Sequence, residues 1–252
     1  MKETILITGA TSGIGEATAL LLAEKGYRII ITGRRKQKLN SLQKKISAST
    51  ECISLCFDIC SKSETESAIL SLPSIWKDVD ILINNAGLAL GLGPVHEGQW
   101  SDWETMINTN VKGLLFITRL ISPRMVARKK GHIINISSIA GKEVYLNGNV
   151  YCATKHAVDA LSKAMRADLL EYGIRVTNIA PGMVETEFSL VRFKGNIDKA
   201  KKVYDKIDAL TGNDIAETIL FAISRPPHVN INDILIMPTS QASSSYVIRK
   251  SK

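Results

Sequence analysis

Short apolar runs alternate with longer amphipathic stretches along most of the chain. Within the amphipathic stretches, apolar residues recur three or four positions apart, which is the spacing of one helix face. Strands that alternate with helices indicate parallel strands joined by right-handed helical crossovers, so the pattern predicts a doubly wound α/β fold. The runs predicted as strands are Thr4–Thr8, Arg28–Thr32, Cys52–Asp58, Ile81–Asn84, His132–Ser137, Arg175–Ala180 and Asp233–Met237.

Three helical stretches add detail to this pattern. The first helix is expected to begin just after Gly13 and to end at Gly26, a residue that suits a left-handed cap. A second amphipathic helix is predicted over Trp103–Val126. The stretch 184–210 interrupts the alternation with a charged helical piece, Asp198–Asp208. Connections this long usually carry function, so we expect the stretch on the substrate side of a site.

Length and composition fit a single domain over residues 1–252, since 45% of the residues are hydrophobic and can form a substantial core. No run approaches the roughly 18 apolar residues of a membrane helix, and Ile5–Ile7 is too short for a signal peptide. We therefore expect a cytoplasmic protein without a membrane partner. Gly212 is an unexpected residue in the first turn of a helix near Asn213, and the polar tail Ser243–Lys252 suggests no role.

The formal net charge of +8 raises the question of nucleic acid, because basic faces bind phosphate backbones. The basic residues are scattered and lack interleaved aromatic residues for base stacking, so we expect solvated faces and no nucleic-acid partner. A basic balance equally attracts a phosphorylated dinucleotide or an anionic substrate.

The four cysteines do not predict a metal site. Cys52, Cys56 and Cys60 recur at a spacing of four, and Cys152 stands alone. Zinc sites usually show close Cys pairs with a second Cys or His pair at a set distance. We expect small buried hydrophobic side chains and no metal.

A glycine-rich motif, Thr8-Gly9-Ala-Thr-Ser-Gly13-Ile-Gly15, lies where the first strand turns into the first helix. Gly9 allows a tight turn, Gly13 lets backbone N–H groups approach a pyrophosphate, and Gly15 lets helix and sheet pack closely. The spacing differs from the generic G-x-G-x-x-G fingerprint, but its place between strand and helix favours a dinucleotide.

The end of the second strand indicates which dinucleotide binds. NAD sites typically place an acidic residue there for the ribose 2′-hydroxyl, whereas NADP sites offer an arginine to the 2′-phosphate. This chain has Arg34 and Arg35 there and no carboxylate. Because guanidinium groups suit phosphate oxygens, NADP is the predicted cofactor.

A second constellation is Tyr151-Cys-Ala-Thr-Lys155, which a helix would place on one face, one turn apart. A tyrosine has a pKa of about 10 and needs a nearby cation to exchange protons at neutral pH, and Lys155 can supply that charge. Ser138 ends a predicted strand and can donate a hydrogen bond to a carbonyl oxygen as it gains charge.

Together these motifs resemble the short-chain dehydrogenase/reductase family over essentially the whole chain. The resemblance implies a Rossmann-type sheet of seven parallel strands in the order 3-2-1-4-5-6-7 with helices on both faces. It also implies hydride transfer to or from a carbonyl or secondary alcohol, and a homotetramer assembled through the helices that carry Asn110 and Tyr151. The matching motifs are Thr8–Gly15, Asn84-Asn85-Ala86-Gly87, the Asn110 of Asn108–Gly113, Ser138, Tyr151-x-x-x-Lys155 and Pro181-Gly182.

The resemblance assigns a role to each matching residue. Tyr151 would be the general acid and base, and Ser138 would orient the substrate oxygen. Lys155 would lower the pKa of Tyr151, and Asn110 would help to hold a water that links the lysine to solvent. The implied cofactor contacts are Gly9, Thr11, Ser12, Gly13, Ile14, Arg34, Arg35, Asp58, Ile59, Asn85, Gly87, Tyr151, Lys155, Pro181, Gly182, Val184 and Thr186.

A narrower similarity is to the 3-hydroxy acid dehydrogenases, which act with NADP on serine, allo-threonine and related short hydroxy acids, or reduce malonic semialdehyde. A 3-hydroxy acid carries a carboxylate, and Arg192 can pair with it bidentately. The alternative for Arg192 is a surface salt bridge. The similar runs are Asn84–Gly91, Trp103–Asn110, Glu187–Gly195 and Pro238–Gln241.

Two other functions use the same motifs or fold. A 3-oxoacyl carrier-protein reductase or a broad carbonyl reductase would act on thioesters or uncharged carbonyls instead of free hydroxy acids. A catalytically silent NADP-sensing scaffold would share the fold, since fold does not determine function. The complete set Asn110, Ser138, Tyr151 and Lys155 argues against the scaffold.

Overall fold

The computed structural model describes residues 2–250 and is built around a parallel sheet. In that part of the chain the sheet has seven strands in the order β3-β2-β1-β4-β5-β6-β7, which confirms the predicted order. Each strand lies where it was predicted, with its ends shifted by at most two residues. The strands are β1 (Thr4–Ile7), β2 (Arg28–Gly33), β3 (Cys52–Cys56), β4 (Ile81–Asn84), β5 (Gly131–Ile136), β6 (Ile174–Pro181) and β7 (Asp233–Ile236).

The helices follow the strands along the chain. No helix within residues 2–250 has both the length and the apolar character needed to cross a bilayer. The α-helices are α1 (Gly13–Glu24), α2 (Lys36–Ile46), α3 (Lys62–Leu70), α4 (Trp100–Ile107), α5 (Leu114–Arg128), α6 (Asn149–Asp168), α7 (Phe188–Arg192), α8 (Ile197–Tyr204) and α9 (Gly212–Ile223). Shorter turns are η1 (Ser74–Trp76), η2 (Val95–Glu97), the π-helical η3 (Asn108–Gly113), η4 (Ile139–Gly141) and η5 (Leu170–Tyr172).

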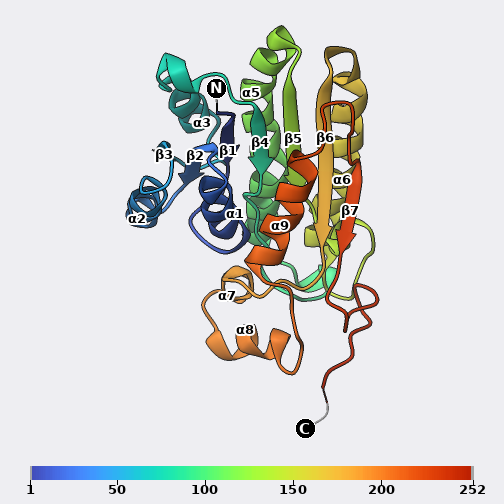
Figure 1. The fold of residues 1–252 in the computed structure, drawn as a ribbon. Coiled ribbons are helices and arrows are strands. Elements are labelled where there is room, and N and C mark those ends of the chain that lie inside the picture. The colour runs from blue at the N-terminus through green and yellow to red at the C-terminus, as the bar shows by residue number, and fades with distance from the viewer. Residues whose placement is uncertain (1, 251–252) are drawn as a thin grey trace.

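Helices cover both faces of the sheet because alternate residues of a strand point to opposite faces. Ile5 and Ile7 of β1 pack in one core with α1, α2 and α9, whereas Leu6 packs in the other with α3, α5 and α6. Figure 1 shows α9 in front of the sheet and α5 and α6 behind it. All three β1 residues are fully buried, which is why this strand is apolar at consecutive positions.

The carboxyl ends of the strands face the segment that was predicted to interrupt the βα alternation. In Figure 1 the arrows of β6 and β7 point toward α7 and α8. Only α8 of the predicted helix Asp198–Asp208 is helical, because Asp205 leaves the helical conformation with a ψ of 124° and Lys206 then adopts a left-handed backbone with φ of 57°. The short helix α7 was not predicted. The long connection therefore lies beyond the strand ends, where open parallel sheets bind ligands.

The predicted helix Trp103–Val126 also needs correction, because it is not continuous. α4 ends at Ile107, the chain makes the π-helical turn η3, and α5 begins at Leu114. π-helical turns are often found at functional sites. Here the turn contains Asn110, whose side chain is buried inside the protein.

Gly212 is the first residue of α9, and the structure explains why it is glycine. A Cβ atom at this position would lie 3.0 Å from the carbonyl oxygen of Gly13 and 3.1 Å from the Cβ of Ala17. α9 therefore crosses α1 at close range, beside the glycine-rich motif. The expectation of a better helix former ignored this contact. Gly26, which follows α1, has a φ of 84° and takes the left-handed conformation that was predicted.

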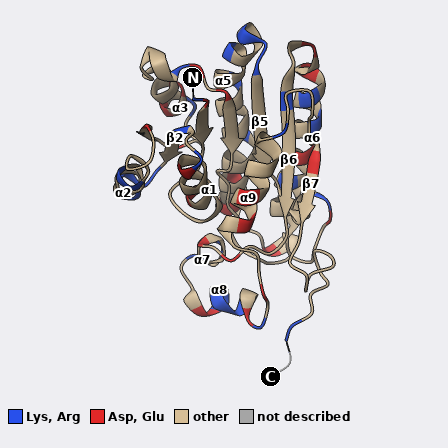
Figure 2. Ribbon diagram, viewed as in Figure 1, with Lys and Arg blue, Asp and Glu red and all other residues tan. Residues whose placement is uncertain are grey.

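Basic and acidic residues are interspersed over the fold. Figure 2 shows Lys and Arg on several elements, α2 and α8 among them, with Asp and Glu in between.

In the C-terminal tail, Gln241 and Val247 form an isolated antiparallel bridge. The Ser244 N–H donates a hydrogen bond to the Glu143 carboxylate at 2.8 Å. Residues 251–252 of the polar tail lie outside the described residues.

Candidate active site

A cavity of about 660 Å³ lies beyond the carboxyl ends of the strands. It is lined by the loops that follow β1 to β6, together with α7. The structure brings together at this cavity every residue predicted to contact the cofactor, and also Ser138 and Arg192. The predicted cofactor residues are Gly9, Thr11, Ser12, Gly13, Ile14, Arg34, Arg35, Asp58, Ile59, Asn85, Gly87, Tyr151, Lys155, Pro181, Gly182, Val184 and Thr186.

The glycine-rich loop forms one end of the cavity. Gly13 has a φ of 56°, and a Cβ atom there would lie 3.0 Å from the Cβ of Thr186, so only glycine fits. Ser12 is the N-cap of α1 and makes no side-chain capping hydrogen bond. The first backbone N–H groups of α1 therefore have no side-chain cap and are available to an anion in the cavity. Asn85 holds the loop in place, since its amide donates to the carbonyl oxygens of Thr8 and Gly9 at 2.9 and 3.2 Å.

Arg35 is fixed beside this helix end. Its guanidinium donates to the Thr11 hydroxyl at 3.0 and 2.8 Å and to the Ser12 hydroxyl at 2.7 Å. Arg34 points to the next strand instead, where it pairs with Asp58 at 3.4 Å. Burial acts to raise the pKa of Asp58, but the Cys60 N–H and the charge of Arg34 hold that pKa below its ordinary value. A phosphate at this end would thus meet a positioned guanidinium and hydroxyl donors.

A carboxylate that was not predicted, that of Glu187, lies beside Arg35 at this end of the cavity. Glu187 comes from the loop before α7 and pairs with Arg35 at 2.7 Å and with Lys38 of α2 at 2.6 Å. The hydrogen bond from Lys38, followed by that from Arg35, lowers the pKa of Glu187 to about 2. In the sequence, Glu187 stands next to Thr186 and begins the run Glu187–Gly195 that is similar to the 3-hydroxy acid dehydrogenases, but no role was assigned to it.

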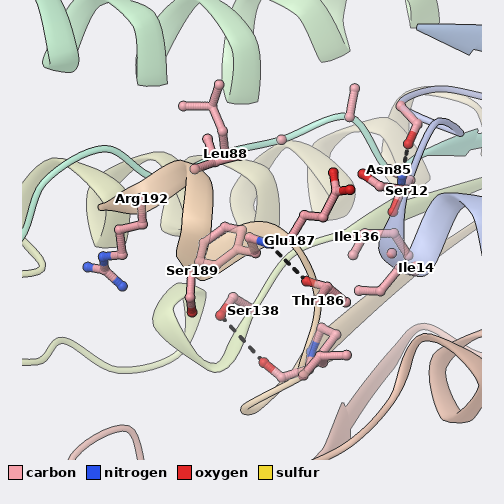
Figure 3. Close-up of a pocket in the computed structure, with 18 of the residues that line it drawn as sticks. Ser12, Ile14, Asn85, Leu88, Ile136, Ser138, Thr186, Glu187, Ser189 and Arg192 are labelled. Atoms are coloured by element: carbon pink, nitrogen blue, oxygen red, sulfur yellow. Dashed lines mark hydrogen bonds between the residues drawn. The ribbon is translucent and has the colours of Figure 1, made fainter. Parts of the chain in front are cut away.

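Tyr151, Lys155 and Ser138 meet in the middle of the cavity, close to the end of β5. The Lys155 ammonium lies 5.9 Å from the centre of the Tyr151 ring and donates to the Ile136 carbonyl oxygen at 2.9 Å. The Ser138 hydroxyl donates to the Pro181 carbonyl oxygen at 3.4 Å. Figure 3 shows Ser138 in the middle of the lining residues, with Arg192 toward one end and Ser12 and Ile14 toward the other.

The expected lowering of the Tyr151 pKa is not seen. Burial raises this pKa well above its ordinary value, Tyr145 adds to the increase, and the nearby Ser138 hydroxyl opposes it in part. Burial also lowers the pKa of Lys155, to about 8. The reason is that both groups are enclosed, and enclosure disfavours the charged form of each. The phenol therefore carries its proton at neutral pH.

Asn110 is a buried residue behind the cavity wall and does not line the cavity. Its side chain accepts a hydrogen bond from the Leu88 N–H at 2.9 Å and donates to the Leu88 carbonyl oxygen at 2.8 Å. It also donates to the Thr154 hydroxyl on α6 at 3.0 Å. Asn110 thus ties the loop after β4 to the helix that carries Tyr151. Asn110 is therefore not a solvent-facing polar residue of a surface helix.

Arg192 closes the opposite end of the cavity. Its guanidinium carbon lies 5.5 Å from the centre of the Tyr151 ring and 5.4 Å from that of Tyr145. It donates to the Tyr145 hydroxyl at 2.9 Å and to the Gly91 carbonyl oxygen at 3.2 Å. Tyr145 was not predicted, because only the folded loops bring it to Arg192. No acidic side chain pairs with Arg192 within residues 2–250, so its charge faces the cavity.

None of the four cysteines lines the cavity. Cys52 and Cys152 are buried, as expected, but Cys60 is half-buried and Cys56 is exposed. The exposure of Cys56 follows from its place at the end of the edge strand β3. Within residues 2–250, no three His, Cys, Asp or Glu side chains are grouped as a metal site requires.

Comparison with known proteins identifies the family. A family model described as short chain dehydrogenase matches residues 3–197. An NADP-dependent 3-hydroxy acid dehydrogenase of Salmonella typhi is 46% identical over 248 residues, which cover 98% of this chain and 99% of that protein. A serine 3-dehydrogenase of Agrobacterium fabrum is 44% identical and is covered to 98%, as is this chain. The closed form of a serine dehydrogenase complexed with NADP+ matches with a TM-score of 0.92 and 44% identity, over 98% of this chain and 100% of that one. The chain therefore belongs to the short-chain dehydrogenase family, as its motifs indicated.

Proposed function

We propose that this protein is an NADP(H)-dependent oxidoreductase that transfers a hydride between the nicotinamide ring and a short 3-hydroxy acid or its 3-oxo acid. Substrates of the serine, allo-threonine or 3-hydroxypropionate type fit best. The observation that carries the proposal is the Arg192 guanidinium, 5.5 Å from the Tyr151 ring in the same cavity. A group that pairs with a carboxylate thus lies beside a group that exchanges a proton. Relatives with 44–46% identity over the whole chain, named for this activity, support the proposal.

The residues at the cavity fit the dinucleotide. The uncapped end of α1 suits the pyrophosphate, and Arg35 with the hydroxyls of Thr11 and Ser12 suits the 2′-phosphate. Asn85 and the Pro181–Thr186 segment line the remaining length of the cleft. When bound, the nicotinamide accepts or supplies the hydride.

The substrate side of the cavity handles the proton and the carboxylate. In reduction, Ser138 donates a hydrogen bond to the substrate oxygen, and Tyr151 transfers its phenolic proton to that oxygen. The raised pKa of Tyr151 keeps this proton on the hydroxyl at neutral pH until it is transferred. In oxidation, Tyr151 accepts the hydroxyl proton. That step requires the phenolate, so it gains from the positive charge of Lys155. Arg192 holds the substrate carboxylate and thereby places the reacting carbon.

The test compares two substrates that differ in one charged group. Wild-type protein and the Arg192→Leu variant are assayed with 3-hydroxypropionate and with 1,3-propanediol, using NADP+ or NAD+ and following the absorbance of the reduced cofactor. We expect NADP+ to be preferred. We also expect the variant to raise KM for the acid about 10- to 100-fold, the value of one charge-assisted bidentate pair, and to leave KM for the diol unchanged. Equal effects on both substrates would remove Arg192 from substrate binding. Activity confined to thioesters or uncharged carbonyls would instead indicate one of the related reductases.

We also propose that the protein assembles as a homotetramer through the helices that carry Asn110 and Tyr151. Trp100, Ile107 and Leu115 support this, because these large apolar side chains of α4 and α5 are exposed in the single chain. Light scattering after size-exclusion chromatography should give about four times the chain mass of 27.6 kDa. A monomer mass would contradict the proposal. The cytoplasmic location stays a prediction.

A further inference from the structure

A salt bridge joins Arg35 and Glu187, two residues that line the cavity and lie far apart in the sequence, and Lys38 binds the same carboxylate. Glu187 precedes α7 on one wall, and Arg35 and Lys38 begin α2 on the other, 152 and 149 residues away. Each carboxylate oxygen binds one cation, Oε2 to Arg35 at 2.7 Å and Oε1 to Lys38 at 2.6 Å. The three side chains are between 41% and 46% exposed, so solvent and a ligand can reach them.

This ion pair occupies the group that the proposed function assigns to the 2′-phosphate. Arg35 is held by Thr11 and Ser12 in a position that leaves its Nη1 for an anion, and Nη1 is the atom that Glu187 takes. A carboxylate between a guanidinium and an ammonium has the charge and the two acceptor oxygens of a partial phosphate mimic. A phosphate bound to these cations would lie close to the Glu187 carboxylate, and because two anions at contact distance repel each other, the binding of one disfavours the other.

We propose that Glu187 is an internal competitor for the 2′-phosphate of the dinucleotide, and that Lys38 is a second cation that binds this phosphate beside Arg35. The proposal rests on the proposed function and adds two residues to it. The sequence motif names only the arginines at the end of β2, whereas the structure adds Lys38, because both cations converge on the same carboxylate. Glu187 thus weakens the binding of a 2′-phosphate and leaves dinucleotides without that phosphate unaffected.

The expected size follows from the strength of an exposed ion pair. In such a pair the formed state is about 2 to 5 times as populated as the broken state. If the phosphate binds only to the broken state, the apparent affinity for the phosphate is about three- to sixfold weaker. Glu187→Gln should therefore tighten the binding of 2′,5′-ADP about three- to sixfold and leave the binding of ADP unchanged. The matched control is Glu185→Gln, which removes an exposed carboxylate two residues away that forms none of the ion pairs within residues 2–250. It should change neither ligand.

The experiment is isothermal titration calorimetry of the full chain with 2′,5′-ADP and with ADP, which contain no nicotinamide and need no turnover. The double variant Glu187→Gln, Lys38→Ala is compared with the single variant Glu187→Gln. Because both proteins lack the internal ion pair, the comparison measures only the contact between Lys38 and the phosphate. In that background, Lys38→Ala should weaken 2′,5′-ADP about fivefold, as expected for one exposed charge pair, and leave ADP unchanged. Lys44→Ala, which removes an exposed lysine from the last turn of α2, is the control and should change neither ligand.

Each failure points to one statement. Unchanged or weaker 2′,5′-ADP binding by Glu187→Gln would overturn Glu187 as a competitor. Loss of ADP binding in that variant would also overturn it, because Glu187 would then bind the ribose itself. Unchanged 2′,5′-ADP binding by Lys38→Ala in the Glu187→Gln background would overturn Lys38 as a phosphate ligand. A wild-type protein that binds NAD+ and NADP+ equally in the same calorimetry would contradict the NADP preference in the proposed function, which is a separate result.

Discussion

Replacing Lys155 by methionine removes a buried charge whose cost depends on pH. The side chain is only 6% exposed, and its ammonium has one hydrogen bond, to the Ile136 carbonyl oxygen at 2.9 Å. Burial lowers its pKa from 10.5 to about 8. Between these two values the unfolded chain binds more protons than the folded one, so the stability of the wild-type protein rises with pH over this window. Below pH 8 the buried charge costs the fold about 3 kcal/mol, and at pH 10 only about 1 kcal/mol of this cost remains.

The Lys155→Met variant avoids this cost but leaves the Ile136 carbonyl oxygen without its partner, a loss of about 1 to 3 kcal/mol at every pH. The variant should therefore match or exceed the stability of the wild-type protein at pH 7 and be the less stable protein at pH 10. The free energy of unfolding is measured in urea by tryptophan fluorescence at pH 7, 8, 9 and 10. Between pH 7 and 10, the free energy of unfolding of the wild-type protein should rise by about 2 kcal/mol relative to that of the variant. Lys44→Met, at an exposed position, is the control. A difference that stays constant from pH 7 to 10 would refute the placement of a charged lysine in this enclosed site.

Three further predictions follow from the structure. Gly212→Ala should destabilise the fold by about 1 kcal/mol in thermal denaturation, because the new methyl would meet the Gly13 carbonyl oxygen at 3.0 Å; unchanged stability would show that α9 yields freely. His132 is buried with its pKa lowered by burial to about 3, so the fold should lose about 2 kcal/mol of stability between pH 7 and 5, and His132→Leu should lose less; equal acid sensitivity would contradict this. Tyr145→Phe should raise KM for 3-hydroxypropionate about fivefold and spare 1,3-propanediol, because Arg192 loses one of its hydrogen-bond partners; a change in kcat alone would argue against a positioning role.

Sequence reasoning succeeded where the determining physics is local. The strands were predictable because a strand covered on both faces is apolar at consecutive positions, as in Ile5-Leu6-Ile7. The glycine-rich motif was predictable because the chain needs a residue without a side chain at Gly9 to leave the strand in a tight turn, and Gly9 has a left-handed backbone with φ of 66°. The resemblance to the family supplied the strand order, and the rule for open parallel sheets supplied the position of the cleft.

The remainder depends on contacts between distant segments. The π-helical turn at Asn110 accompanies two hydrogen bonds between its side chain and the Leu88 backbone, and no periodicity in the helix shows that partner. Glu187 and Lys38 have no distinguishing pattern in the sequence and come together only in the folded chain. The pKa of Tyr151 illustrates the same limit, since spacing predicted a neighbouring cation but not the degree of enclosure, and enclosure dominates.

The proposed chemistry depends on the proton of the Tyr151 hydroxyl. Tyr151→Phe keeps the ring that packs 5.6 Å from Phe188 and removes only that hydroxyl, so the cavity should keep its shape. The decisive measurement is kcat for 3-hydroxypropionate with NADP+, together with the Kd of NADPH from its fluorescence. We predict a fall in kcat of at least about 100-fold, the usual contribution of a general acid or base, with the Kd of NADPH unchanged. A variant that turns over at a rate near that of the wild type would contradict the assignment of Tyr151 as the proton-exchanging group.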